Sequence, residues 1–271
     1  MLEMLSTMFS YQFMVRALIV GVLVSLCAAL LGVSLVLKRY SMIGDGLSHV
    51  GFGALAVATA LGMAPMAVTI PVVVLAAFLL LRLSSTGRLK GDAAIAMIST
   101  GSLAVGVIVL SLSTGMTSDV NNYLFGSMLA MSEGDVTLSL ILGAAVLTLF
   151  LVFYRRIFAV TFDETFARAT GGHAEACNML LALLTAVTIV LGMRVMGTML
   201  ISSLIIFPAL TAMRVCRSFK SVTLCAAAVS VVCFFVGLCA SYLLSTAAGA
   251  TVVVANILAF LAFAAVGRLR G

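Results

Sequence analysis

The chain has 271 residues, of which 63% are hydrophobic and only 9% are charged. This apolar surface exceeds what one water-soluble core can bury, which excludes a soluble globular protein and predicts an integral membrane protein. The net charge is +6, but the cations form short clusters between long apolar runs, so no basic face that would bind nucleic acid is predicted. The six cysteines include no C-x-x-C pair, which indicates neither a zinc finger nor a disulfide framework.

Nine hydrophobic runs follow one another along the chain, each close to the roughly 20 residues that a membrane-spanning helix needs. They cover residues 12–37, 43–62, 65–83, 92–112, 135–154, 175–192, 195–212, 221–243 and 250–267. Several runs are short or rich in glycine, so eight spanning helices with one re-entrant segment remain an alternative to nine. We therefore expect an all-α integral membrane protein, a polytopic bundle of eight to nine transmembrane helices, with one membrane domain over residues 1–271.

The cations cluster after every second hydrophobic run, and this pattern predicts the orientation of the chain in the membrane. Lys and Arg are retained in loops on the cytoplasmic side, and 13 of the 15 follow runs one, three, five, seven and nine. The C-terminus is therefore expected in the cytoplasm and the N-terminus outside. Arg16 and Arg194 are the two exceptions. The opposite face carries Asp119, Glu133 and Asp135, so we expect an acidic mouth there that favours arriving cations.

The second run begins with the most distinctive local pattern, Ser41–His49, in which Asp45 and His49 are four residues apart. On a helix this spacing places the carboxylate and the imidazole on one face. A charged Asp inside a membrane helix costs about 2.5 to 3.5 kcal/mol on insertion scales, so it needs a partner or a function. One oxygen and one neutral nitrogen ligand suit a divalent first-row metal such as Zn or Mn. The alternative is that the two side chains hydrogen-bond to each other and only fix helix packing.

The depth of this pair in the membrane is an open point. If Arg39 marks the cytoplasmic interface, six residues of unbroken helix place Asp45 only about 9 Å inside. A bend in the first run, or a protein-lined break over residues 40–44, would place the pair deeper.

The inner linker over residues 155–174 contains a short predicted helix. Its acids at the start, Asp163 and Glu164, and its glycines at the end, Gly171 and Gly172, are helix start and stop signals. No Gly-Lys pair occurs anywhere in the chain, so it has no P-loop and cannot hydrolyse ATP by that route.

Three segments, in family order and at nearly family spacing, resemble the membrane permeases of bacterial ABC importers for zinc, manganese and iron(II). They are residues 38–49 (KRYSMIGDGLSH), Asp119 with residues 123–129 (YLFGSML), and residues 196–209 (MGTMLISSLIIFPA). The resemblance runs from about Arg39 to the last helix. It implies a single permease domain that is not itself an enzyme, with ATP hydrolysis on a separate subunit.

The resemblance also implies an assembly in the bacterial inner membrane. Its expected partners are two copies of an ATP-binding subunit, a second permease copy, an extracytoplasmic metal-binding protein and membrane lipid, without nucleic acid. The family's intramembrane Asp and His match Asp45 and His49, which are then ligands of the metal in passage. No cofactor is bound permanently, and the transported metal is Zn or Mn. We favour zinc because imidazole suits it and a two-fold dimer offers four ligands.

A coupling segment near residues 162–172 is implied as well, seated in a cleft of the ATPase. Its composition agrees, because Phe162, Phe166 and Ala169 give an apolar ridge whose phenylalanines would otherwise be exposed to water. The residues expected to take part in coupling are Phe162, Asp163, Glu164, Phe166, Arg168 and Gly171.

Two other classes of protein could use the same Asp and His. A proton-coupled secondary metal transporter would titrate them near neutral pH and would need neither an ATPase nor a coupling helix. A membrane metalloenzyme would use them as two ligands and leave a coordination position open, but it needs a third ligand and a general base. No suitable pair stands out in the sequence.

Overall fold

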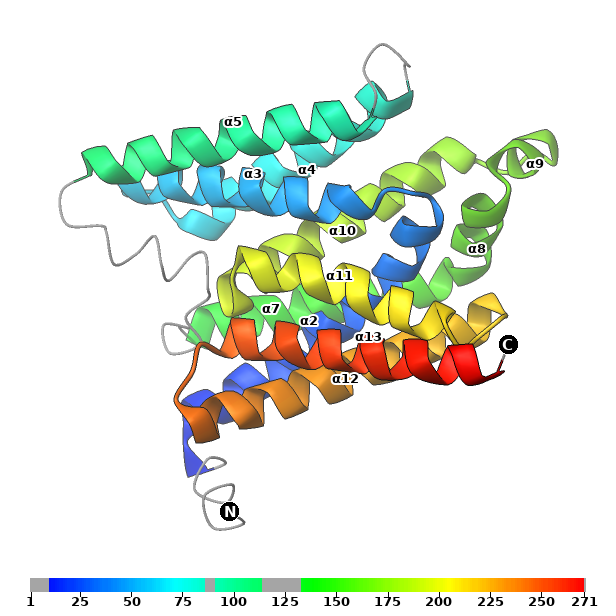
Figure 1. Cartoon of the computed structure of the whole chain (residues 1–271). Helices are drawn as coiled ribbons and strands as arrows, with labels where there is room; N and C mark the ends of the chain where they lie inside the picture. Colours follow the sequence, from blue (N-terminus) through cyan, green and yellow to red (C-terminus); the bar gives the residue numbers. More distant parts are fainter. Residues whose placement is uncertain (1–9, 86–90, 114–132, 271) are drawn as a thin grey trace.

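A computed structural model describes residues 10–85, 91–113 and 133–270, and within these ranges the chain is helical, with no strand (Figure 1). The long helices are α2 (Gln12–Leu37), α3 (Ser41–Ala60), α4 (Pro65–Ser85), α5 (Gly91–Leu112), α7 (Glu133–Val152), α10 (Ala174–Met196), α11 (Thr198–Met213), α12 (Phe219–Leu244) and α13 (Ala248–Arg270). Two short helices, α8 (Tyr154–Phe162) and α9 (Glu164–Ala169), lie between α7 and α10. Each predicted hydrophobic run coincides with one long helix, so the all-α membrane fold is confirmed.

The number of spanning helices needs a correction. Within the described ranges, seven helices are long and apolar enough to cross a membrane. α3 is not apolar enough, because it carries Asp45, His49 and four glycines. α11 is not long enough, because it has only 16 residues. At about 1.5 Å per residue, α11 spans about 24 Å, less than the roughly 30 Å of a bilayer core. The expected eight to nine spanning helices are therefore too many by length and composition.

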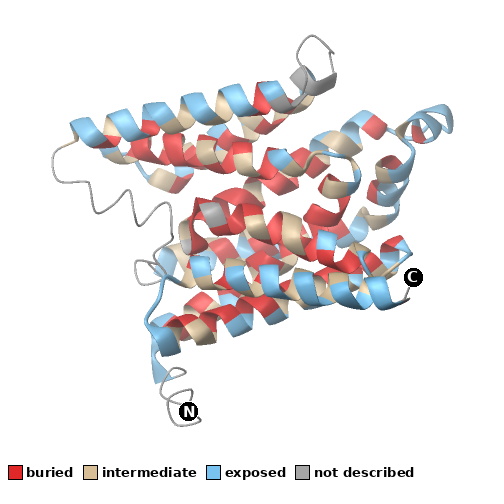
Figure 2. Ribbon diagram, in the orientation of Figure 1, coloured by how far each residue is buried: buried red, intermediate tan, exposed pale blue. Residues whose placement is uncertain are grey.

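The core of the bundle is formed around α2 and α10. Most of the apolar length of these two helices is buried inside the chain, whereas α5, α7 and α13 leave most of theirs exposed (Figure 2). The exposed side chains on α5 and α13 include large aliphatic residues such as Val105, Ile108 and Leu258. In a membrane such surfaces face lipid or another protein without a hydrophobic penalty.

α3 is held between α5 and α11 by contacts that only small residues permit. A Cβ at Gly53 would lie 2.6 Å from the carbonyl oxygen of Ser102 in α5. A Cβ at Gly46 would lie 2.6 Å from Ile95 Cγ2, and one at Gly44 would lie 3.0 Å from Ile205 Cδ1 in α11. The glycines around Asp45 therefore allow the close helix packing that the sequence predicts.

The predicted cytoplasmic segments gather at one end of the bundle. Figure 1 shows the α2–α3 corner, α9, the α11–α12 connection and the C-terminal end of α13 on the same side. The two exceptional cations lie toward the other end, where each is paired: Arg16 donates to Glu133 at 2.6 Å and Arg194 donates to Asp135 at 2.8 Å.

These ion pairs correct the expected acidic mouth. Glu133 and Asp135 neutralise arginines of α2 and α10, so they do not present unbalanced negative charge to an arriving cation. Asp119, the third acid of that prediction, lies outside the described residues. The same holds for residues 123–129.

Candidate functional site

Asp45 and His49 lie on one face of α3, as their spacing predicts. His49 Nε2 is 3.7 Å from Asp45 Oδ2. This separation is too long for a direct hydrogen bond, so the interpretation in which the two only bond to each other loses its main support. Two metal–ligand bonds of about 2.1 Å each can bridge donor atoms that are up to roughly 4.2 Å apart. The observed 3.7 Å lies within that limit. One metal ion could therefore contact both atoms.

Ser202 of α11 is a site residue that the sequence did not identify. Its hydroxyl lies 3.2 Å from Asp45 Oδ1 and also 3.2 Å from the Thr198 carbonyl oxygen, so it can donate to either acceptor. Ser202 is only 8% exposed. The bond to Oδ1 orients the Asp45 carboxylate and leaves Oδ2 facing His49. Ser202 lies within the segment that carries the family resemblance, but its spacing predicts no contact with α3.

The site is open on one side and has few ligand side chains among the described residues of one chain. The Asp45 side chain is 41% exposed and the His49 side chain 19%. His49 Nδ1 is buried and has no hydrogen-bond partner within the described residues, and an orphaned buried group of this kind costs free energy. Over the described ranges, no group of three or more His, Cys, Asp or Glu side chains is placed to hold a metal ion. The described part of one chain thus offers two ligand side chains.

The contact with α11 places this pair at the level of Ser202 along the bundle. Ser202 comes eleven residues before the end of α11, a distance of about 17 Å along the helix axis. α11 begins directly after Gly197, whose φ of 86° and ψ of 163° only glycine adopts readily. The α2–α3 corner is itself set into the bundle, since the Lys38 side chain is only 7% exposed. Arg39, the residue that the sequence takes as the marker of the cytoplasmic interface, is exposed at this corner, and the depth of Asp45 in the membrane stays a prediction.

The short helix α9 begins and ends where the sequence predicts. Asp163 caps its start, because its Oδ1 accepts a hydrogen bond of 2.8 Å from the Phe166 backbone N–H. Gly171 follows its end in the left-handed region at φ 80°. The Phe166 side chain is 64% exposed and projects from the surface of the chain. A groove of about 700 Å³ lies beside α9, between α8 and α10, and Phe166 forms part of its wall.

Phe162 differs from the prediction in its surroundings. Its ring packs against Phe158 at a centroid distance of 5.0 Å and against Phe219 of α12 at 5.9 Å. Much of the side chain is still exposed, but one side of the ring belongs to an aromatic cluster of this chain. Of the three residues expected to form one apolar ridge, Phe166 and Ala169 are exposed on α9, whereas Phe162 ends α8.

Glu164 and Arg168, expected as polar contacts for the ATPase, bond first to each other and to this chain. Glu164 Oε1 accepts from Arg168 at 2.7 Å, and its Oε2 accepts from Lys38 Nζ at 3.2 Å. Burial opposes ionisation of Glu164, but hydrogen bonds with Asn178 and Lys38 and the nearby positive charges outweigh it and lower its pKa. Burial lowers the pKa of Lys38, and the Glu164 carboxylate counters part of that effect. Glu164 is therefore directed into the permease.

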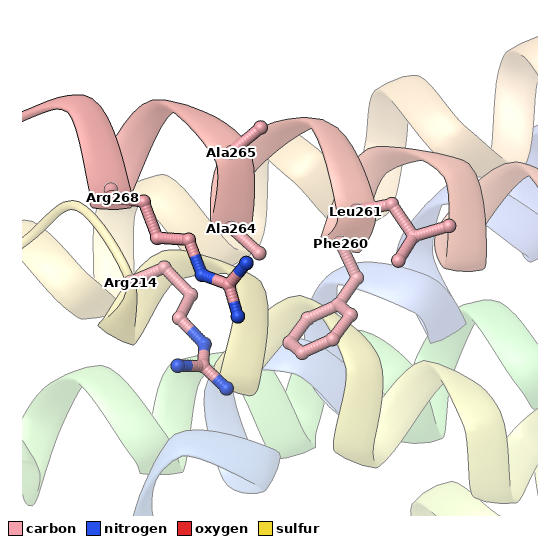
Figure 3. A pocket seen from close by; sticks show the side chains of 7 residues that line it. Arg214, Phe260, Leu261, Ala264, Ala265 and Arg268 are labelled. Carbon is pink, nitrogen blue, oxygen red and sulfur yellow. The ribbon is translucent and has the colours of Figure 1, made fainter.

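A second groove, of about 490 Å³, lies between the ends of α11 and α13 (Figure 3). Arg214 and Arg268 line it, and the Arg214 guanidinium lies 5.3 Å from the centre of the Phe260 ring. The other lining residues are small or apolar. Two positive charges without an acid in the lining repel a metal cation, so this groove is not a candidate metal site.

The family model described as the ABC 3 transport family matches residues 10–267. The chain belongs to this family. It is 29% identical over 259 residues to the manganese import system permease protein ScaB of Streptococcus gordonii, covering 96% of this chain and 93% of that protein. It is 30% identical over 250 residues to the high-affinity zinc uptake system membrane protein ZnuB of Haemophilus influenzae, covering 92% and 96%. A solved structure, PsaBC from Streptococcus pneumoniae in complex with Fab, superposes with a TM-score of 0.86 at 29% identity, covering 96% and 94%.

These comparisons confirm the family resemblance and the prediction of a permease subunit with ATP hydrolysis on a separate chain. The ABC 3 family member described here is therefore a multi-pass membrane protein, and the family implies an ATP-binding subunit and a substrate-binding protein as partners. The roles of Asp45 and His49, and those of the coupling residues, stay predictions.

Proposed function

We propose that this chain is the membrane permease of an ATP-driven importer that passes a divalent first-row metal into the cytoplasm, with zinc favoured over manganese. The observation that carries the proposal is the Asp45–His49 pair on α3. Its two facing donor atoms are 3.7 Å apart, and Ser202 orients the carboxylate from the opposite side. Oxygen and neutral nitrogen donors at this separation fit the bond lengths of Zn²⁺ and its neighbours.

The open side of the site supports a two-fold dimer. The described residues of one chain offer two ligand side chains, and the exposed part of Asp45 leaves room for a second pair. A second permease copy would bring its own Asp and His to the same ion and complete a four-ligand set, the number that Zn²⁺ prefers. Relatives named for manganese and for zinc are similarly close to this chain, so the preference for zinc rests on ligand chemistry alone.

The rest of the assembly follows the family pattern. Two ATP-binding subunits would bind α9 on the cytoplasmic side, and an extracytoplasmic metal-binding protein would deliver the ion at the opposite end, in a bacterial inner membrane with the C-terminus inside. ATP binding and hydrolysis would then switch the bundle between outward and inward access. Such a switch requires contacts that differ between the two states.

The other classes are less well supported. A secondary transporter driven by protons gives no role to a capped, exposed α9 with Phe166 projecting from it. A membrane metalloenzyme needs a third protein ligand, and the described residues place no third His, Cys, Asp or Glu beside the pair.

The test is metal uptake into lipid vesicles that contain the permease with its ATP-binding subunit and are supplied with the extracytoplasmic metal-binding protein. We expect Asp45→Ala and His49→Ala each to abolish ATP-dependent uptake of zinc and manganese, because each removes a ligand and leaves apolar packing intact. Met42→Ala is a matched control, since Met42 is exposed on the same helix and is not a predicted ligand. Uptake at the wild-type rate in either ligand variant would refute the site, and competition between the two metals would test the preference for zinc.

A further inference from the structure

Lys38 is a buried charged residue to which the proposed transport cycle has so far given no role. It follows the last residue of α2, and its side chain is 7% exposed. Its ammonium group donates to Glu164 Oε2 of α9 at 3.2 Å and to Asn178 Oδ1 of α10. These partners lie 126 and 140 residues away in the sequence. A lysine that is removed from water in this way needs such partners to remain charged.

Lys38 is also the first residue of the connection between α2 and α3, the helix that carries Asp45 and His49. Only Arg39 and Tyr40 separate it from Ser41, the first residue of α3. This corner is closed by backbone hydrogen bonds, including Tyr40 N–H to the Leu35 carbonyl at 2.8 Å and Arg39 N–H to the Val36 carbonyl at 3.1 Å. Arg39 takes a left-handed conformation at φ 62°, which a non-glycine residue rarely adopts. A corner held this tightly passes a displacement of Lys38 to the start of α3.

The bonds of Lys38 to Glu164 and Asn178 also connect α9, which would bind the ATPase, with the start of α3, which carries the metal ligands. α9 carries the exposed Phe166, and Asp45 is four residues into α3. Glu164 and Asn178 both line a groove of about 520 Å³ that reaches the α2–α3 corner at Tyr40. A shift of α9 therefore pulls directly on an ion pair whose lysine is buried and whose glutamate side chain is 34% exposed, and not on a fully solvated pair whose partners separate freely.

We propose that Lys38, bonded to Glu164 and Asn178, is a positioning residue that transmits the position of α9 to the start of α3 and so to Asp45 and His49. The inference rests on the proposed function, because it explains how docking of an ATPase at α9 would change the metal site. It assigns Lys38 no contact with the metal or with the ATPase.

The experiment compares Lys38→Met and Asn178→Leu with the wild-type complex of permease and ATPase in lipid vesicles supplied with the metal-binding protein. Each variant removes one polar partner and keeps a side chain of similar length. We expect metal uptake per ATP hydrolysed to fall at least about tenfold in each variant, while metal binding to the detergent-purified permease and co-purification of the ATPase stay at wild-type levels. The double variant should lose no more than the worse single variant, because both act on one link.

Arg39→Gln is the matched control. It removes the same charge from the next residue of the corner, but Arg39 is exposed, so uptake per ATP should stay at the wild-type value. Wild-type coupling in Lys38→Met would overturn the inference, and so would a loss of metal binding or of ATPase co-purification, which would assign Lys38 to folding or docking. The proposed function fails by a different result, namely no ATP-dependent metal uptake by the wild-type complex.

Discussion

At the scale of single residues, the candidate metal site depends on how one carboxylate is shared. Asp45 Oδ1 accepts from Ser202, and Oδ2 faces His49. The Ser202 hydroxyl has a second acceptor at the same distance, the Thr198 carbonyl one turn earlier in its own helix. A hydroxyl with one proton can serve only one of them fully. Ser202 can therefore release Asp45 without being left unpaired, which suits a ligand that must hold an ion briefly.

Ser202→Ala tests this arrangement. Removing the hydroxyl frees the carboxylate to rotate, and outer-shell partners of metal ligands are typically worth about 10- to 100-fold in affinity. We expect zinc affinity of the detergent-purified permease to fall by that range. Ser202→Thr keeps the hydroxyl and should retain most of the affinity. Equal affinities for the wild-type protein and Ser202→Ala would show that the serine has no part in the site.

At the scale of the helix elements, local signals predicted the structure well and long-range contacts were missed. The apolar runs locate the long helices, and Asp163 and Gly171 bound α9, because hydropathy and capping act within a few residues. The burial of Lys38 was missed, since its partner Glu164 is 126 residues away. The contact of Ser202 with Asp45 joins residues 157 apart. No periodicity in a single sequence encodes such pairings.

The α9 element yields a prediction about docking. Phe166 is largely exposed in the chain by itself, so its removal should leave folding unchanged. If the ATPase buries it, the contact contributes about 1.5 to 3 kcal/mol, the usual range for a large apolar side chain. Phe166→Ala should therefore weaken co-purification of the ATPase by roughly 10- to 100-fold, or leave ATP turnover that no longer drives uptake.

Two neighbouring substitutions separate docking from folding. Thr170→Ala, at the exposed end of α9, should change ATPase binding little. Phe162→Ala should lower the thermal stability of the permease itself, because the ring packs on Phe158 and Phe219. Normal ATPase binding and uptake in Phe166→Ala would mean that α9 is an ordinary connecting segment.

At the scale of the whole molecule, charge is arranged differently at the two ends of the bundle. Among the described residues, Lys and Arg outnumber Asp and Glu at the end with α9 and the C-terminus, whereas Arg16 and Arg194 near the other end are each matched by an acid of α7. These two pairs tie α2 and α10 to the start of α7. Because the positive-inside rule counts retained Lys and Arg, the first end is expected in the cytoplasm. The two ion pairs explain how Arg16 and Arg194 are tolerated at the opposite end of the bundle.

The orientation can be checked by labelling introduced cysteines in intact cells with a membrane-impermeant thiol reagent. Ala247 and Ser218 are both exposed, in the connections before α13 and before α12. The positive-inside rule predicts that Ala247→Cys reacts from outside, and that Ser218→Cys reacts only after the membrane is permeabilised. The unsubstituted chain, with its six native cysteines, gives the background for both positions. Reaction of Ser218→Cys from outside intact cells would invert the topology, place α9 on the extracytoplasmic side, and remove the physical basis for its contact with a cytoplasmic ATPase.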